Sequence, residues 1–292
     1  MSRLKEMLDG GSFAVTAEIG PPKGVDINRV IEPLLPFRNR LAAVNVTDNQ
    51  SSIMRASSVA ASVMLMQHGI EPVYQLTCRD RNRLALQSDA LGAYALGIRN
   101  VLVLSGDHPK VGDHPQAKPV YDLDSVNLLE ALDGLRKGFD MAGQTLTAAP
   151  SEFLLGAAVS PESDAPELQL MKMEKKVRVG ADFFQTQPVF DVERFARFRE
   201  ETASLESRVL AGIILLKSPA MAKFMNENIA GISVPQDIID EMASVPKEDF
   251  YKKSIEIAAR VITGLKGVAD GVHIMAIGWE RHIPAVLDAA GL

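Results

Sequence analysis

Cysteine is nearly absent from this sequence. Cys78 is the only one, which excludes an internal disulfide and a cysteine-rich metal site. Basic residues are not in excess, because 31 Lys and Arg stand against 37 Asp and Glu, and they form no stripe of the kind that binds nucleic acid. Also missing are a run of about 18 apolar residues and the apolar segment of a signal peptide. We therefore expect a soluble, cytoplasmic protein that binds neither nucleic acid nor a membrane.

Two sequence fingerprints of nucleotide-binding folds are missing as well. The sequence contains neither G-x-G-x-x-G nor G-x-x-x-x-G-K-[ST], which mark dinucleotide-binding and P-loop folds. His108 and His114 have no carboxylate cluster or cysteine at ligand spacing, so we expect no metal site. What the chain does have is a hydrophobic content of 47% over 292 residues, enough to bury a large core. The length suits one (β/α)8 barrel of about 250 residues, and we treat residues 1–292 as one domain.

Short apolar segments recur along the chain, each followed by a polar or glycine-containing turn and then by a helical pattern. The predicted strands cover residues 13–19, 41–46, 72–76, 101–104, 153–159, 182–186, 209–215 and 272–277. The predicted helices cover residues 4–8, 28–37, 52–67, 82–96, 123–138, 166–179, 192–203, 218–226 and 235–265. Nearly continuous apolar strands that alternate with helices are typical of parallel strands covered on both faces.

The spacing of the strand ends distinguishes two α/β architectures. Five of the seven intervals between successive strand ends are close to the length of one βα unit, about 30 residues. The two longer intervals indicate a long loop over residues 110–120 and a helical insertion before the last strand. Eight such units predict a (β/α)8 barrel, whose active site lies at the carboxyl ends of the strands. A doubly wound sheet is the alternative, but it normally has fewer units.

Two carboxylates are predicted to meet at that face of the barrel. The strand at residues 101–104 leads through Ser105 and Gly106 to Asp107, and the first strand carries Glu18. Two carboxylates at one barrel mouth can play different roles, the less solvated one serving as an acid. Each also has a structural interpretation, Asp107 as a turn cap and Glu18 as the partner of a lysine.

Six motifs in order and spacing resemble the methylenetetrahydrofolate reductase family. They are Ala17-Glu18-Ile19-Gly20-Pro21-Pro22-Lys23, Val46-Thr47, Gln75-Leu76-Thr77-Cys78-Arg79-Asp80, Leu104-Ser105-Gly106-Asp107-His108-Pro109, Lys175-Lys176-Val177-Arg178-Val179-Gly180-Ala181-Asp182 and Thr186-Gln187-Pro188-Val189-Phe190-Asp191. The resemblance covers essentially the whole chain and is strongest over residues 13–191.

The resemblance implies a flavin-containing (β/α)8 barrel that reduces the one-carbon bridge of 5,10-methylenetetrahydrofolate to a 5-methyl group. It assigns Glu18 as the general acid, Asp107 as a catalytic and folate-anchoring residue beside the flavin, and Gln187 as a folate-binding residue. The positions that it matches to flavin binding are Thr47, Asp48, Gln75, Ser105, Gly106, Asp107, Tyr121, Ser160, Lys175 and Lys176. It implies no metal ligand.

Several positions depart from the family pattern. Gln75 and Ser160 stand where many members have histidine, and Ser105 stands where many bacterial members have arginine. We therefore expect FAD, with FMN as the alternative. Residues 273–280 resemble the branch found in anaerobes, which implies electrons either from NAD(P)H or from an iron-sulfur and zinc partner subunit.

Three further possibilities stay open at this point. The chain is compatible with a homo-oligomer. It is also compatible with a flavin-free pterin-binding barrel reductase, or with a non-catalytic flavin electron-relay subunit of a larger complex.

Overall fold

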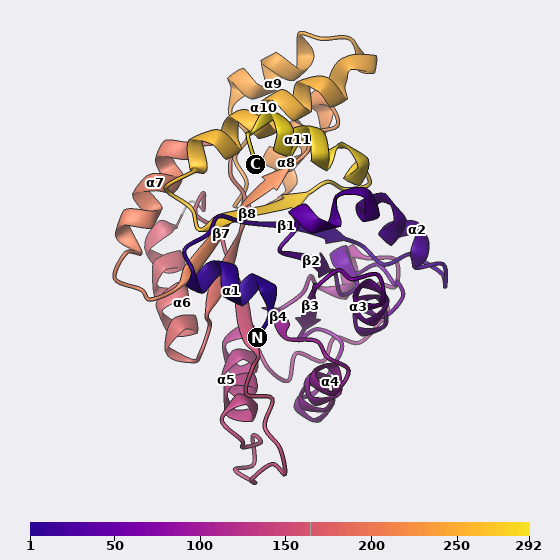
Figure 1. Cartoon of the computed structure of the whole chain (residues 1–292), viewed down its shortest axis with the longest axis vertical. Helices are drawn as coiled ribbons and strands as arrows, with labels where there is room; N and C mark the ends of the chain where they lie inside the picture. Colours follow the sequence, from indigo (N-terminus) through magenta and orange to yellow (C-terminus); the bar gives the residue numbers. More distant parts are fainter. Residues whose placement is uncertain (164, 230) are drawn as a thin grey trace.

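A closed barrel of parallel strands forms the centre of the computed structural model, which describes residues 1–163, 165–229 and 231–292 (Figure 1). The strands are β1 (Ala14–Ile19), β2 (Ala43–Val46), β3 (Pro72–Thr77), β4 (Asn100–Leu104), β5 (Leu154–Val159), β6 (Phe183–Pro188), β7 (Arg208–Ile214) and β8 (Gly271–Met275). Each strand pairs in parallel with the next one along the chain, and β8 pairs with β1. The predicted (β/α)8 barrel is confirmed.

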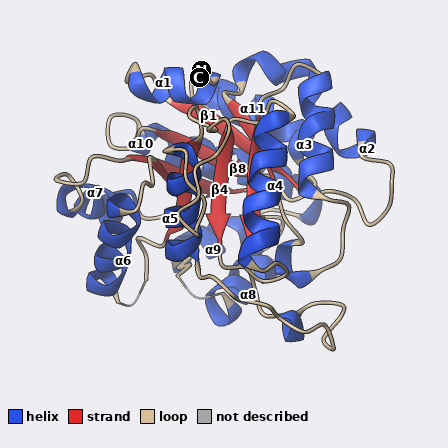
Figure 2. Ribbon diagram, turned by 90° about the horizontal axis from the view of Figure 1, so that it is seen from below, coloured by secondary structure: helices blue, strands red, loops and turns tan. Residues whose placement is uncertain are grey.

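Helices surround this barrel on its outer side (Figure 2). They are α1 (Arg3–Asp9), α2 (Asn28–Ile31), α3 (Ser58–Gln67), α4 (Arg83–Ala95), α5 (Ser125–Arg136), α6 (Pro166–Arg178), α7 (Val192–Glu201), α8 (Pro219–Asn228), α9 (Gln236–Ala243), α10 (Phe250–Leu265) and α11 (Ile283–Ala289). Residues 105–124 connect β4 to α5 and contain a short 3-10 turn, Pro109–Val111. Between β7 and α10 lie α8 and α9, which bury an apolar cluster of their own. In the described residues, no helix has the length and apolarity needed to span a membrane.

Local backbone chemistry explains where the element bounds differ from those predicted. The helix expected over 28–37 is α-helical only to Ile31 and continues as a 3-10 helix, Glu32–Arg40, because this segment contains two prolines. The helix expected over 52–67 begins at Ser58, since Asn49, Ser51 and Ser52 all have positive φ. The last strand ends at Met275, two residues early, because residues 277 and 278 also have positive φ.

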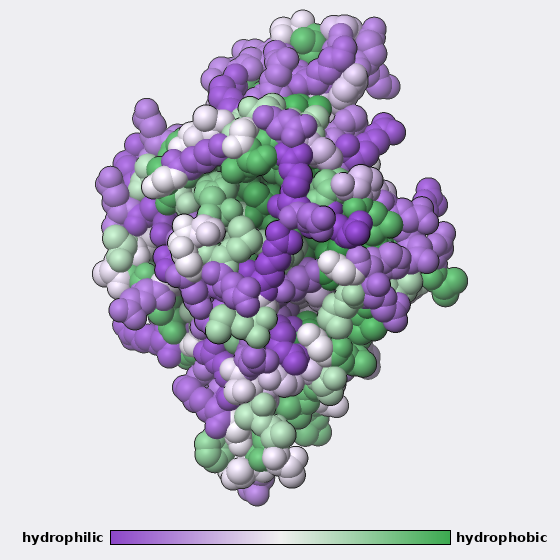
Figure 3. Space-filling view, viewed as in Figure 1, coloured by the Kyte–Doolittle hydropathy of each residue, from purple (hydrophilic) through white to green (hydrophobic). Residues whose placement is uncertain are grey.

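The amino end of the barrel interior is apolar and closed. Leu102, Leu154, Phe183 and Leu210 pack there with Leu4 and Leu8 of α1 and with smaller side chains. In Figure 2, α1 lies at the end of the barrel where the strands begin. Figure 3 shows the face that carries α1, where polar and apolar side chains are mixed. A cavity of about 680 Å³ lies at this end, lined in part by Lys5 and Asp9 of α1 and by Asp182 and Arg208.

Side chains in the next layer of the barrel interior are polar and mutually hydrogen-bonded. The amides of Asn45 on β2 and Gln185 on β6 exchange two hydrogen bonds, 2.6 and 3.1 Å long. Thr16 on β1 lies 3.1 Å from His273 on β8, measured from Oγ1 to Nδ1. These buried pairs form the polar floor on which the cavity at the carboxyl end rests.

Candidate functional site

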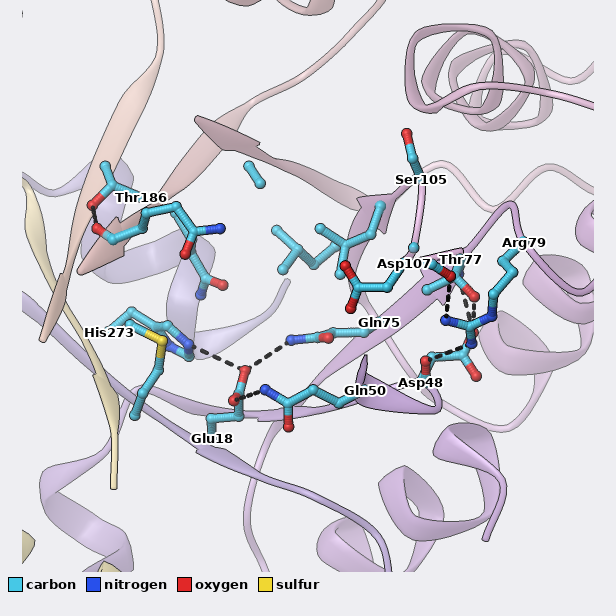
Figure 4. A pocket seen from close by; sticks show the side chains of 17 residues that line it. Glu18, Asp48, Gln50, Gln75, Thr77, Arg79, Ser105, Asp107, Thr186 and His273 are labelled. Atoms are coloured by element: carbon cyan, nitrogen blue, oxygen red, sulfur yellow. Dashed lines mark hydrogen bonds and ion pairs between the residues drawn. The ribbon is translucent and has the colours of Figure 1, made fainter. Parts of the chain in front are cut away.

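A cavity of about 410 Å³ opens at the carboxyl ends of the strands (Figure 4). This volume lies within the usual range for small-molecule sites, roughly 300–1,000 Å³. The lining residues are Glu18, Asp48, Gln50, Gln75, Thr77, Arg79, Leu102, Leu104, Ser105, Gly106, Asp107, Ala158, Gln185, Thr186, Gln187, His273 and Met275. They come from six of the strands and from the loops that follow β2, β3 and β4. The mixture of carboxylates, amides and apolar side chains suits a flat, polar-edged heterocycle.

Glu18 lies at one wall of the cavity, and donors from three other elements approach its carboxyl group. Gln75 Nε2 donates to Oε2 over 3.1 Å, and Gln50 Nε2 donates to Oε1 over 3.4 Å. His273 Nε2 lies 3.5 Å from Oε2 (Figure 4). The Glu18 side chain is only 13% exposed. A carboxyl group that is held in place and largely shielded from water is well suited to give or take a proton.

Asp48 and two arginines form a rigid second wall. Asp48 accepts from the backbone and hydroxyl of Thr77 at 3.0 and 2.8 Å, and from Arg81 at 2.7 Å. Arg79 is 2% exposed and donates to the carboxylate of Asp80 and to the carbonyls of Asp48 and Asp107. Burial by itself lowers the pKa of Arg79, but hydrogen bonds and attraction from Asp80 outweigh it, so the pKa is raised. Arg79 therefore stays charged and fixes the loop after β4.

That loop brings Asp107 to the cavity. Gly106 has φ +83°, and a Cβ there would lie 3.2 Å from the Cβ atoms of both Thr77 and Arg79. Tyr121 donates from its hydroxyl to the Gly106 carbonyl over 3.0 Å. In Figure 4 the Asp107 carboxylate points into the cavity, across from Glu18. The predicted meeting of the two carboxylates at one mouth is confirmed in the fold.

The other residues implied by the family pattern fall into two groups. Asp48, Gln75, Ser105, Gly106 and Gln187 line the cavity together with the two carboxylates. Thr47 is buried and is not among the described residues that line the cavity, and its hydroxyl is without a hydrogen-bond partner among the described residues. Tyr121 contacts the cavity wall from outside through Gly106.

Ser160, Lys175 and Lys176 are not among the described residues that line the cavity. Lys175 is exposed on α6. Lys176 reaches inward and donates to the carbonyl of Ala158, a cavity residue, over 2.8 Å. Burial, and to a smaller extent the nearby Lys172, lowers the pKa of Lys176 to about 8. Over the described part of the chain, no group of three His, Cys, Asp or Glu side chains is placed to hold a metal ion.

Residues 3–291 match the family described as methylenetetrahydrofolate reductase. The chain belongs to the methylenetetrahydrofolate reductase family. A probable methylenetetrahydrofolate reductase (NADPH) of Caenorhabditis elegans is 26% identical over 84% of this chain and 36% of its own length. Methylenetetrahydrofolate reductase 2 of Schizosaccharomyces pombe is 25% identical over 99% of this chain and 47% of its own length. The 5,10-methylenetetrahydrofolate reductase of Salmonella typhimurium is 27% identical over 73% of this chain and 68% of its own length. The chain thus spans less than half the length of the first two relatives.

Among solved structures, one that aligns with almost the whole chain is of a folate-binding protein. It is an uncharacterized protein from Clostridium thermocellum that binds two copies of 5-methyl-5,6,7,8-tetrahydrofolic acid. The TM-score is 0.65 at 16% identity, with 99% of this chain and 98% of the other covered. At this identity the likeness is one of fold.

A site role was not predicted for every residue that lines the cavity. Gln50, Arg79 and His273 were not predicted as site residues, although Arg79 stands inside one of the six methylenetetrahydrofolate reductase motifs, and all three line the cavity. Gln50 lies in the loop after β2 and begins a short 3-10 turn, so its position shortly after a strand end was the available signal. His273 lies inside an apolar strand, where only the knowledge of which side faces the barrel interior singles it out.

Proposed function

We propose that this protein reduces 5,10-methylenetetrahydrofolate to 5-methyltetrahydrofolate with a reduced flavin as hydride donor. The observation that carries the proposal is the placement of Glu18, held by Gln75 and Gln50, in the same cavity as Asp107 and Gln187. An acid that faces a second carboxylate and an amide fits a substrate with a basic nitrogen bridge and a pterin edge. Family membership supports the same chemistry.

The residues around the cavity fit a flavin. The buried Thr47 hydroxyl lacks a partner among the described residues, so a hydrogen bond to it is available. Gly106 has a positive φ and no room for a Cβ beside Thr77 and Arg79, so at this one position the loop presents only backbone. Gln75, Ser105 and Asp107 would hold the ring system, with Lys176 as a partner for a phosphate. When bound, the flavin supplies a hydride to the substrate carbon.

The protein's own side chains carry the remaining tasks. Glu18 would donate a proton to a bridge nitrogen as the bond between that nitrogen and the methylene carbon opens. Gln187 would hold the pterin edge through its amide, which can both donate and accept. Asp107 would anchor the pterin from the opposite wall, and its negative charge would disfavour an anion beside it. The hydrogen-bonded polar layer below the cavity, and the apolar layer at the amino end beneath it, close the barrel interior under this region.

The test follows the flavin spectrum. The purified protein, reconstituted with FAD or FMN if necessary, is reduced chemically without oxygen and then mixed with 5,10-methylenetetrahydrofolate. We expect the wild type to be reoxidised. Glu18→Gln should keep the flavin and lose reoxidation at least 100-fold, the lower range of general acid catalysis. The exposed Glu130→Gln on α5 is the control and should behave as wild type.

Two results would contradict the proposal. One is a wild-type protein that takes up no flavin, and the other is a Glu18→Gln variant that keeps near-full activity. Reduction of the bound flavin by NADH or NADPH would identify the electron donor. A flavin that neither nucleotide reduces, but that the folate reoxidises, would support a partner subunit as the donor.

A further inference from the structure

His273 is a buried histidine in the cavity wall that the proposed chemistry leaves without a role. Its side chain is 4% exposed and belongs to β8, directly opposite Thr16 in the β1–β8 register. The next residue of β1 on the same inner side is Glu18. Strand pairing therefore places the imidazole against both Thr16 and Glu18, with Nδ1 at 3.1 Å from the hydroxyl and Nε2 at 3.5 Å from the carboxyl.

The Thr16 hydroxyl constrains which imidazole nitrogen carries hydrogen. Thr16 Oγ1 lies 3.3 Å from the Val272 carbonyl, which can only accept, so the hydroxyl proton points there. The oxygen is then left to accept from His273, which requires hydrogen on Nδ1. In the neutral ring, Nε2 is consequently the bare nitrogen, and it faces Glu18.

We propose that Glu18 and His273 hold one shared proton in the resting protein, and that His273 is the positioning residue that keeps this proton beside the substrate. This inference rests on the proposed function of the site and assigns the source of its proton. Either the carboxyl group is protonated and faces bare Nε2, or the carboxylate faces an imidazolium N–H. Both arrangements carry no net charge and satisfy Thr16 equally.

The surroundings explain why a histidine is needed. The amides of Gln75 and Gln50 both donate to Glu18, and donors of this kind favour the ionised carboxylate. The other titratable groups that line the cavity are Asp48, Arg79 and Asp107. Asp48 is engaged by Arg81, and Arg79 by Asp80, so Asp107 is the charged side chain that faces the pair across the cavity. Imidazole is the side chain that can take up and release a proton near neutral pH, so His273 can supply the carboxyl group with the proton that the amide donors do not.

The proton balance is simple. In each turnover one proton leaves the pair through Glu18 Oε2 and bonds to a bridge nitrogen, while the bond from that nitrogen to the methylene carbon breaks. The nitrogen keeps the electron pair of that bond and shares it with the proton. Glu18 is left as carboxylate and His273 as neutral imidazole, and one proton from solvent restores the pair after product leaves.

The experiment compares pH profiles of the folate reaction in the flavin-reduced protein. His273→Gln keeps a polar side chain but holds no proton. We expect its rate at pH 7 to fall at least tenfold relative to wild type, and the loss to shrink toward pH 5, so that the descending limb moves to lower pH by about one unit. His68→Gln, at the end of α3 and outside the cavity, is the matched control. An equal loss at every pH would show a merely structural role and overturn the inference.

A second measurement needs no activity. The chain has five histidines, so NMR titration of their ring signals is tractable, and sequence-specific assignment of the wild-type spectrum identifies the signal of residue 273. Glu18→Gln removes the neighbouring carboxyl, so we expect protonation of His273 to require a pH lower by about one unit or more. An unchanged midpoint would overturn the inference even if the substituted histidine variant fails to fold. A wild type that does not react with the folate, while this midpoint still moves, would instead refute the proposed function alone.

Discussion

Gly156 on β5 gives the sharpest test of how the barrel interior is packed. It stands opposite Phe183 in the β5–β6 register, and a Cβ built on it would lie 2.3 Å from Cζ of that ring and 2.5 Å from Cε1. Ordinary carbon contacts are about 3.5–4.0 Å, so Gly156→Ala must displace the ring by more than about 1 Å. The ring is fully buried inside a closed barrel and has no free space to enter. We therefore expect a loss of about 3 kcal/mol, the upper part of the usual range for overpacking.

Denaturant unfolding measures this loss as a lower midpoint with an unchanged slope. Gly92→Ala is the control, because that glycine is exposed in α4 with open space around it, and alanine there should stabilise by about 0.5–1 kcal/mol. Combining Gly156→Ala with Phe183→Leu should cost at least about 1 kcal/mol less than the sum of the two single changes, since the smaller side chain relieves the clash. A Gly156→Ala protein within about 0.5 kcal/mol of wild type, or additive changes, would refute this account of the packing.

Three other predictions concern charged groups. Asp48→Asn should destabilise the protein by about 3 kcal/mol, because Arg81 and the two Thr77 donors lose their buried carboxylate partner. A denaturation midpoint equal to that of the wild type would contradict the view that Asp48 and the arginines form a rigid cavity wall. Asp113→Asn should speed proteolysis within residues 107–120, because the Asp113 carboxylate contacts Lys23, His114 and the Met54 amide and so holds this loop. These contacts, first the one with Lys23, lower the pKa of Asp113, so they stabilise the loop at pH values above the ordinary aspartate pKa and are lost in acid. Unchanged cleavage would contradict this role. In the wild type, burial lowers the folded-state pKa of Lys176 to about 8, so the unfolded chain binds more protons between about pH 8 and 10.5 and stability rises with pH in that window. Lys176→Met should remove this rise. Thermal unfolding that shows the same dependence of stability on pH in both proteins would contradict the prediction.

Strand number and order could be predicted from the sequence because they depend on periodicity. Buried parallel strands are nearly continuous apolar segments, and a closed barrel repeats its βα unit at a fixed spacing. The bounds were less predictable where backbone geometry overrides side-chain pattern. The segment after β2 shows this, because three residues with positive φ delay α3 to Ser58, and such conformations leave no mark in hydrophobic periodicity.

For the site, prediction succeeded where a residue follows a strand end and failed where contact depends on which side of a strand faces inward. Glu18 and Asp107 were predicted to share the mouth, and they do. His273 could not be identified in this way, since its strand is apolar on both sides in sequence and the register with β1 decides its neighbours. Arg79 was hidden for another reason: a charged residue after a strand is expected in solvent, whereas here Asp80 and two carbonyls enclose it.

The layered interior of the barrel has a consequence for how this chain can be altered. Along β1 the inward positions are Ala14, Thr16 and Glu18. One strand therefore contributes in turn to the apolar layer at the amino end, to the polar floor and to the cavity. Residues only two apart in sequence are thus constrained differently: Ala14 by side-chain volume, Thr16 by hydrogen-bond complementarity and Glu18 by reactivity. A library that varies the loops and the cavity-lining positions other than Asp48 and Arg79 should therefore explore new ligands at little risk to folding. Changes in the apolar layer at the amino end require compensating partners on facing strands.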